Sequence, residues 1–473
     1  MDSYDLSMRY QPQDEQAPVA ATAVIRATAS EALDSFTLDA SGFDVRSVSV
    51  DGAEASFSLD AAKEKLAVTP AAPLAAGHAM EIRVDYTVDP QAGGRGWIKT
   101  GDRTGFAVAA QPDAAHTVFP CNDVPSDKAA FSFNVSVPSG SGDIGVASGL
   151  KTGQTAEDGY TTYHYKSEHP IATELIQIAA GKYKVTEQGT VDGVPVRDVV
   201  PQDAGGKFSY ALGLTPGQMK WITDPGRLGA FPLESYGILA ADTTAGQPFG
   251  FTGLETQTLT IYNPSYLANR TDEKLIGSHM MHELAHSWFG GSITPATWSD
   301  NWLSEGHANY YGLDYRYAKG WPSPNGATTM EEAMKIAYQA GDSYRQMYGP
   351  VAKPKDESAV YSNQAYLGGP LALYALQQKV GQDTFHQIEE AFIKEYKDKS
   401  ASTADYIRIA QETAGADTGK FLEDWLYGTT TPEMPGHPDW KAGTMTAAHA
   451  QDPADILAQD PAVKPLLEPH GTH

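Results

Sequence analysis

The sequence has very little cysteine and comparatively few basic residues. Its single cysteine, Cys121, excludes an intramolecular disulfide and a cysteine-based metal cluster, and we expect a small buried residue there rather than a nucleophile. Only 34 lysines and arginines stand against 59 aspartates and glutamates, which gives a formal net charge of −25. Because nucleic acids and anionic membranes repel an acidic surface, we expect neither as a partner.

Long hydrophobic runs and a signal peptide are also absent from the sequence. No run of about 18 apolar residues occurs, so no membrane-spanning segment is expected. Residues 2–6 already have the pattern of a strand, and we expect Met1 to mark the point where a leader was removed. This favours a secreted or cell-envelope protein over a cytoplasmic one.

The first 186 residues have the pattern of an all-β domain. Short runs of β-branched and apolar residues are separated by turn-forming glycine, proline and aspartate. We predict layered sheets in residues 1–186, with strands at Val19–Ala29, Ser35–Leu38, Val45–Val50, Ala55–Leu59, Met80–Val88, Phe131–Val137 and Ile176–Tyr183.

Helical periodicity dominates residues 187–430, so the predicted fold is a multidomain α+β protein. A strand is expected at Thr256–Tyr262, where it would pair with the backbone of a bound peptide. Residues 431–473 are expected to form an extended tail with little function. The predicted helices are 208–224, 272–290, 303–319, 329–346, 366–380, 383–397, 402–413 and 417–427.

The stretch His282-Glu283-Leu284-Ala285-His286 is the strongest motif in the chain. Histidines four residues apart on a helix differ by about 40° of rotation, so both imidazoles leave one face and can share a metal ion. Glu283 lies beside that face, where a carboxylate can take a proton from water held by the metal. Thr271 and Asp272 are suitable helix N-caps, and Gly290–Gly291 is a suitable stop. The alternative is a helix with two surface histidines.

Glu305 turns this motif into a specific prediction. It lies on the next predicted helix, with eighteen residues between it and His286, where a carboxylate supplies the third protein ligand of a catalytic zinc. A third histidine at the corresponding short spacing is excluded, because those positions hold Phe289 and Ser292. We therefore predict one catalytic Zn²⁺ held by His282, His286 and Glu305.

These stretches resemble the aminopeptidase N type of zinc metallopeptidase, a family that also contains the leukotriene-forming epoxide hydrolase. The zinc stretch is similar to the family's H-E-L-A-H-x-W-F-G, and Glu305 stands in its W-L-x-E-G at the family's spacing. Thr252 to Thr256 resembles the family's G-A-M-E-N element. The resemblance implies a saddle-like β domain followed by a thermolysin-like catalytic domain, in a short member without the helical C-terminal domain.

The resemblance also implies roles for further residues. Glu255 and Gln111 would bind the free α-amine of a substrate, with Gly253 beside them, and a carboxylate with an amide acceptor suits an ammonium group. Tyr366 would donate a hydrogen bond to the developing oxyanion, with Tyr361 as the alternative. On physical grounds alone, Asp300 is a candidate partner for the outer N–H of a metal-bound histidine.

Four positions depart from the family's pattern. Thr252 and Thr256 replace a glycine and an asparagine of the amine element, and Gly368 replaces a basic residue after the tyrosine. His307 replaces a phenylalanine, and we expect it to be packed rather than to reach the zinc. The first three changes affect substrate positioning, and the zinc chemistry is unaffected.

The prediction is a monomeric zinc aminopeptidase that removes N-terminal residues from peptides with a free amine, with Glu283 as general base. One alternative is an endopeptidase, because a cleft without the C-terminal cap would admit internal peptide bonds. Another is a catalytically silent peptide-binding module on the same fold. A third alternative, epoxide hydrolysis, rests only on the resemblance to the family and on no residue of this sequence.

Overall fold

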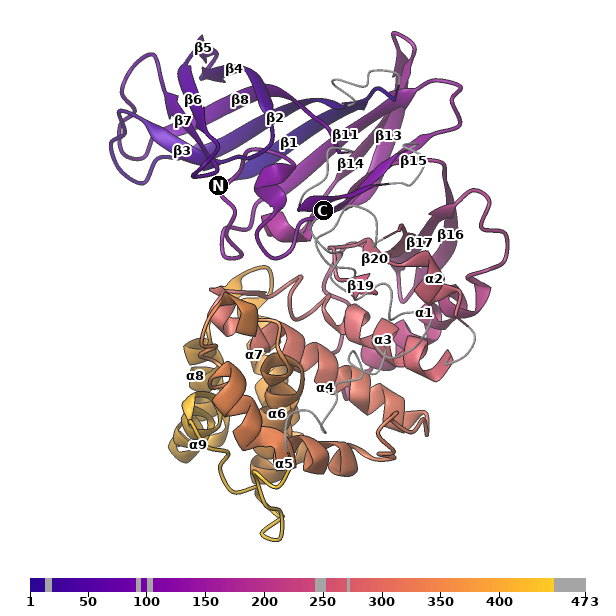
Figure 1. Ribbon diagram of the computed structural model, residues 1–473, viewed down its shortest axis with the longest axis vertical. Coiled ribbons are helices and arrows are strands. Elements are labelled where there is room, and N and C mark those ends of the chain that lie inside the picture. The colour runs from indigo at the N-terminus through magenta and orange to yellow at the C-terminus, as the bar shows by residue number, and fades with distance from the viewer. Residues whose placement is uncertain (13–18, 91–94, 100–104, 243–251, 270–272, 446–473) are drawn as a thin grey trace. The chain divides into compact units, whose positions relative to one another are not determined.

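The computed structural model describes residues 1–12, 19–90, 95–99, 105–242, 252–269 and 273–445, which form two compact units. Among the described residues, the first unit comprises those within Met1–Phe208 and Leu233–Pro264, and the second comprises Ser209–Pro232 and those from Ser265 to Met445. The first is rich in strands and the second is mainly helical (Figure 1). The division falls later than the boundary expected at residue 186, because further strands follow that residue and group with the first unit.

The largest sheet of the first unit has eight strands in the order β13-β14-β11-β1-β2-β8-β4-β5 (Figure 1). Buried and more exposed residues alternate along β1 and β2, as expected for strands with one face on a core. Two smaller sheets have the orders β12-β15-β10-β9 and β3-β7-β6. The strands of these three sheets are β1 (Ser3–Tyr10), β2 (Val19–Thr28), β3 (Phe36–Asp39), β4 (Asp44–Val50), β5 (Ala53–Glu54), β6 (Ser56–Asp60), β7 (Lys65–Thr69), β8 (Ala79–Val88), β9 (Gly96–Lys99), β10 (Phe106–Ala109), β11 (Ala130–Pro138), β12 (Ile144–Ala147), β13 (Leu150–Glu157), β14 (Tyr160–Lys166) and β15 (Ile178–Gly181).

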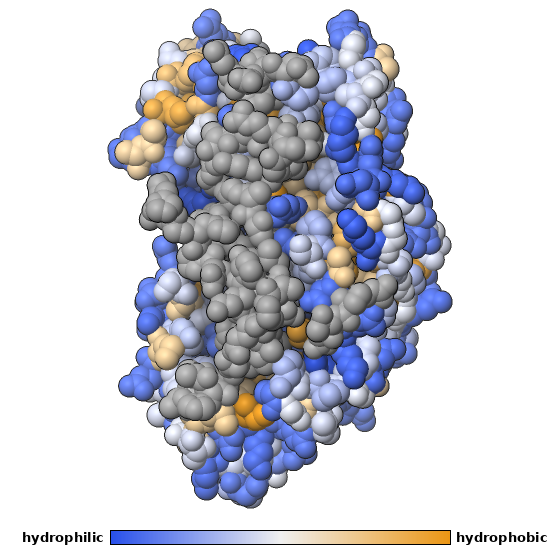
Figure 2. All heavy atoms as spheres, turned by 45° about the vertical axis from the view of Figure 1, so that its right-hand side comes forward, coloured by the Kyte–Doolittle hydropathy of each residue, from blue (hydrophilic) through white to orange (hydrophobic). Residues whose placement is uncertain are grey.

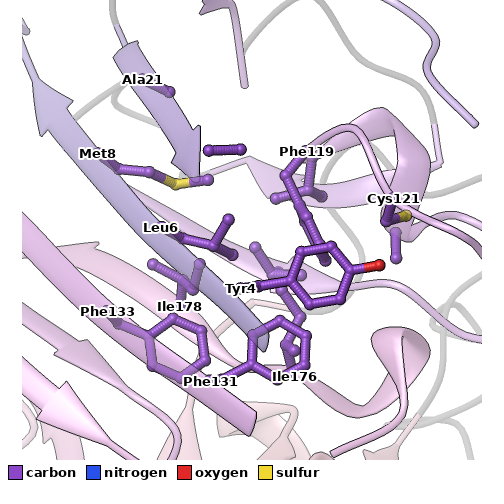
Figure 3. Packing of buried hydrophobic residues seen from close by; sticks show 14 of the residues in the cluster. Tyr4, Leu6, Met8, Ala21, Phe119, Cys121, Phe131, Phe133, Ile176 and Ile178 are labelled. Atoms are coloured by element: carbon purple, nitrogen blue, oxygen red, sulfur yellow. The ribbon is translucent and has the colours of Figure 1, made fainter. Parts of the chain in front are cut away.

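Aromatic rings from distant segments meet in the core of this unit (Figure 3). The ring of Tyr4 stacks on Phe131 with centroids 4.9 Å apart and meets Phe119 edge-on at 5.4 Å. Cys121 lies beside them, fully buried, and burial together with nearby carboxylates raises the pKa of its thiol well above the ordinary value. The expectation of a small buried residue at this position is therefore confirmed.

A five-stranded sheet, β16-β17-β18-β20-β19, completes the first unit. The strand expected at Thr256–Tyr262 is wrong in extent, because Gln257 and Thr258 form a turn and Thr258 has a φ of 64°. β20 is also paired on both sides, so among the described strands β19, and not β20, lies at that edge of the sheet. The strands are β16 (Tyr183–Val191), β17 (Val194–Pro201), β18 (Tyr236–Ala240), β19 (Gly253–Leu254) and β20 (Thr260–Tyr262).

Helices form the second unit, and each lies where helical periodicity predicts one, except for the short α2. The helix over 272–290 is shorter than predicted, because α3 ends at Ala285 and a turn carries the chain to Gly290. The expected N-caps of this helix, Thr271 and Asp272, lie outside the described residues. The helices are α1 (Ser209–Ile222), α2 (Pro264–Leu267), α3 (Glu273–Ala285), α4 (Trp302–Ala318), α5 (Met330–Tyr348), α6 (Gly369–Val380), α7 (Gln382–Tyr396), α8 (Thr403–Ala414) and α9 (Ala416–Tyr427), with a two-stranded sheet of β21 (Thr294–Pro295) and β22 (Ser400–Ala401).

The described part of the C-terminal tail, up to Met445, has no helix or strand but packs on the second unit. Thr431 N–H donates to Asp342 of α5, and Trp440 stacks on Tyr374 of α6. Hydrophilic residues predominate among the coloured residues in Figure 2, in keeping with the net charge of −25. No described helix combines the length and the apolarity that crossing a membrane requires.

Candidate active site

The neighbouring helices α3 and α4 and the turn directly after α3 carry the three predicted metal ligands (Figure 1). Gly312 of α4 favours the close approach of the two helices, because a Cβ at that position would lie 3.2 Å from the Cβ of His282, which is a tight contact. His286 comes one residue after the end of α3, yet its N–H donates to the carbonyl of His282 at 3.3 Å. Both histidines therefore keep the i,i+4 spacing of a helix.

The ligand atoms of His282, His286 and Glu305 converge on one point within the second unit. The two Nε2 atoms are 3.1 Å apart, and each lies 3.4 Å from Glu305 Oε2. A tetrahedral zinc with bonds of about 2.0–2.1 Å holds its ligand atoms about 3.3–3.4 Å apart. The separations therefore fit a zinc ion, and nitrogen and carboxylate oxygen are ligands that zinc accepts.

The electrostatics of His282 and Glu305 favour the protonation states that bind a cation. Burial lowers the pKa of His282, which favours a neutral imidazole. Burial alone would raise the pKa of Glu305, but the neighbouring His286 and His282 outweigh it and hold the pKa well below the usual range. Neutral histidines and an ionised glutamate are the forms that coordinate metal.

A backbone carbonyl and a serine hold the ring of His286. Its Nδ1–H donates to the carbonyl oxygen of Phe289 at 2.9 Å and lies 3.0 Å from Ser304 Oγ. Ser304 Oγ–H in turn donates to the same carbonyl at 3.1 Å. This arrangement fixes the tautomer of His286 so that the lone pair of Nε2 faces Glu305.

Asp300 does not have the predicted role of supporting a metal-bound histidine. Its Oδ1 accepts hydrogen bonds from the N–H and the hydroxyl of Thr403, both at 2.8 Å. Its Oδ2 accepts from the N–H and the hydroxyl of Thr297 at 3.2 and 2.8 Å. Both oxygens are therefore used to cap a short 3₁₀ helix and the start of α8, which corrects the expectation from sequence.

This correction makes a testable prediction for Asp300→Ala. Four hydrogen bonds to a buried carboxylate are lost, so we expect the free energy of unfolding to fall by about 2–4 kcal/mol, measured in denaturant. The zinc content of the purified variant, measured by atomic emission, should equal that of the unaltered protein. A variant that folds normally but has lost its zinc would restore the role predicted from the sequence.

Glu283 is buried on the same helix as the two histidines, with 4% of its surface exposed. Its Oε1 accepts a hydrogen bond from His279 Nε2 at 2.8 Å. Its Oε2 is buried and has no hydrogen-bond partner among the described residues. Burial raises the pKa of this carboxyl, but His279 and the two ligand histidines outweigh that effect, so the pKa is lowered and the group is ionised.

Tyr366 is half-buried in a short π-helix, Gln364–Gly368, that leads into α6. Its ring centroid lies 6.2 Å from that of His282, and its carbonyl accepts a hydrogen bond from the Asn309 side chain of α4. The alternative, Tyr361, instead packs against Trp298 at 6.1 Å. Tyr366 thus has a ring contact to a candidate ligand.

His307 is packed, as expected from the sequence, and does not join the metal ligands. Its ring stacks on Phe289 with centroids 4.1 Å apart, and its Nδ1–H donates to the carbonyl of Leu303 at 2.8 Å. Its Nε2 lies 3.4 Å from the buried carboxylate of Glu389. The imidazole of His307 is therefore held by the Leu303 carbonyl and by stacking on Phe289.

The predicted amine-binding residues come together in the first unit. Gln111 Nε2–H donates to Glu255 Oε1 at 2.7 Å, although 144 residues separate them in sequence. Gly253 lies in β19, two residues before Glu255. Gln177, which the sequence did not single out, links the two segments: it exchanges hydrogen bonds with the backbone of Val108 at 3.1 and 2.9 Å and donates to the Thr256 hydroxyl at 3.3 Å.

Comparison with known proteins found a matching family domain in each of the two units. The peptidase M1 N-terminal domain matches residues 1–175, and the peptidase family M1 domain matches residues 210–425. The chain belongs to peptidase family M1. A crystal structure of an M1 zinc metallopeptidase from Deinococcus radiodurans, a glutamate-to-alanine variant bound to a Tyr-Ser-Ala substrate, matches with a TM-score of 0.75 and 27% identity, covering 92% of this chain and 95% of that one. A two-domain M1 zinc metallopeptidase bound to L-tryptophan matches with a TM-score of 0.74 and 26% identity, covering 92% and 95%.

Curated relatives of this M1 metallopeptidase carry several activities. Leukotriene A-4 hydrolase of Xenopus laevis is 24% identical over 463 residues, which cover 92% of this chain and 72% of that protein. Glutamyl aminopeptidase of Mus musculus is 23% identical over 360 residues, which cover 70% of this chain but only 37% of that protein. The M1 chain thus spans little more than a third of that aminopeptidase.

One residue of this M1 site was missed from the sequence. His279 lies four residues before Glu283 on α3, and that i,i+4 spacing already predicts that the two side chains meet. One i,i+4 histidine–glutamate pair is a weak signal in a chain with 13 histidines.

Proposed function

We propose that this M1 metallopeptidase is a zinc aminopeptidase that hydrolyses the N-terminal peptide bond of peptides. The observation that carries the proposal is the convergence of His282, His286 and Glu305, at separations that suit zinc, on the helix pair that also holds the ionised carboxylate of Glu283. A zinc ion bound there would supply a Lewis acid and a water molecule of lowered pKa.

The side chains of the second unit would carry the proton and stabilise the developing charge. Glu283 accepts the proton of the attacking water and delivers it to the leaving amine, which makes it general base and then general acid. The phenol of Tyr366 donates a hydrogen bond to the oxyanion of the tetrahedral intermediate. The buried position of Glu283 supports this assignment, because a desolvated carboxylate interacts strongly with a nearby proton.

Gln111 and Glu255 would bind the α-ammonium group of the substrate. The hydrogen bond from Gln111 Nε2 to Glu255 orients the amide, so that its oxygen and the Glu255 carboxylate are the acceptors offered to a cation. Recognition of a free amine would restrict cleavage to the first residue. The Tyr-Ser-Ala peptide and the single amino acids bound by the two-domain M1 structures support a substrate of this class.

Cleavage of matched substrates tests the proposal. We expect turnover of aminoacyl fluorogenic substrates with a free amine, at least about 100-fold slower turnover of their N-acetylated forms, and loss of activity with a zinc chelator that added zinc reverses. Equal cleavage of both forms would show an endopeptidase instead. Bound zinc without turnover of either form would point to a peptide-binding module.

A further inference from the structure

The general-base carboxylate assigned above has a partner of its own on the same helix. His279 lies one turn before Glu283, and its Nε2 is 2.8 Å from Glu283 Oε1. His279 is not one of the converging ligands, which are His282, His286 and Glu305. Either charge state of an imidazole can donate from Nε2, so the hydrogen bond does not depend on the protonation of His279.

The two oxygens of the Glu283 carboxylate therefore have different environments. Oε1 is held by His279, whereas Oε2 is buried and has no hydrogen-bond partner among the described residues. A buried carboxylate oxygen without a donor costs free energy, and proteins keep such a group mainly where it has a function. One oxygen is thus anchored while the other remains available to accept a proton.

The ring of His279 is itself held in place. It meets the ring of Tyr266 edge-on, with centroids 5.3 Å apart and planes 70° apart, and Tyr266 is 1% exposed. The side chain of His279 is 19% exposed, so the surrounding structure covers most of it. A packed aromatic neighbour limits the rotation of the imidazole and so fixes the direction of its Nε2–H.

We propose that His279 is a positioning residue, which holds Glu283 by Oε1 so that Oε2 is the oxygen that takes the proton from water. The expected effect on turnover rests on the proposed function. The anchoring of Glu283 by His279 rests on the geometry alone. Outer partners that orient groups at metal sites typically contribute about 10- to 100-fold. We expect an effect of that size on kcat and little effect on KM, because His279 acts through Glu283 and not on the substrate.

Two variants of the zinc-loaded protein separate positioning from packing. His279→Leu fills the space without a donor, and His279→Gln places an amide nitrogen at the same number of bonds from Cα as Nε2. We expect His279→Leu to lower kcat about 10- to 100-fold with KM and zinc content unchanged, and His279→Gln to recover most of the loss. Equal impairment of both variants, or no impairment of either, would overturn the proposal.

A second comparison uses Glu283→Gln as background. If His279 acts only through Glu283, adding His279→Leu to that variant should lower kcat no further, whereas a full additional loss would contradict the inference.

Crystal structures of the zinc-loaded variants decide the anchoring without any activity. Glu283 should keep one conformation in the unaltered protein and in His279→Gln, and should leave that conformation or occupy two in His279→Leu. An unchanged Glu283 in His279→Leu would overturn the anchoring. Should the unaltered protein turn over no peptide substrate, the proposed function fails, while these structures still test the role of His279.

Discussion

Replacing Glu283 by glutamine is expected to lower kcat about 10²- to 10⁴-fold, the range that a positioned general base contributes. Glutamine has nearly the shape of glutamate but cannot take a proton at neutral pH. The zinc is proposed to be held by His282, His286 and Glu305, so the variant should bind zinc with the stoichiometry of the unaltered protein. Turnover on a free-amine substrate and metal content by atomic emission, measured on one preparation, check both statements.

A matched control separates loss of the carboxylate from a general effect on the helix. Glu273 lies in the first turn of α3, and the same change there, Glu273→Gln, should leave kcat within about twofold, because the residue is remote in sequence from the motif. The Tm of each variant, measured by thermal unfolding, shows whether the two changes affect stability equally. If the Glu283→Gln protein retains full turnover, the proposed mechanism is wrong, whatever its zinc content.

The metal site could be predicted from the sequence because the geometry of a helix relates residues that are close along the chain. The spacing of His282 and His286 fixes their relative orientation on any helix, and helical periodicity located α3 and α4 to within a few residues. The position of Glu305 needed more, because only the resemblance to a family indicated that α4 packs beside α3. Its distances to both histidines come from the structure alone.

Predictions that depend on long-range partners failed or could not be made. Asp300 is close in sequence to the metal ligands, but its carboxylate accepts a hydrogen bond from Thr403, which lies 103 residues later. His286 Nδ1–H donates to the backbone carbonyl of Phe289, in the turn after α3. Every residue has such a carbonyl, so the residue types do not indicate which one accepts. Proximity along the chain was therefore a poor guide to which group orients a ligand.

The strand expected at Thr256–Tyr262 failed for a local reason. Alternating threonine and aliphatic residues have the period of a strand, but Thr258 adopts a left-handed conformation and ends the pattern. Its hydroxyl accepts a hydrogen bond from Gly149 N–H at 2.7 Å, a contact across 109 residues that helps to hold this turn. Tertiary contacts of this kind override a pattern that is only a few residues long.

Replacing Glu305 by alanine is expected to abolish zinc binding and turnover together. The variant leaves two neutral imidazoles 3.1 Å apart with no anionic ligand. Changes to the outer partners of a metal ligand already cost about 10- to 100-fold in affinity, so loss of a ligand should exceed 100-fold. Competition with a chromogenic zinc chelator measures the affinity, and the same samples report turnover.

Thermal unfolding gives an independent measure of the same loss. Zinc at about 100 times its dissociation constant stabilises a protein by about 2.7 kcal/mol, so added zinc should raise the Tm of the unaltered protein. The Tm of Glu305→Ala should not respond to the same zinc concentration. Glu390→Ala, at an exposed glutamate of α7, is the matched control and should keep the full response. A zinc-dependent rise in the Tm of Glu305→Ala as large as that of the control would remove Glu305 from the ligand set, and with it the geometric basis of the proposed function.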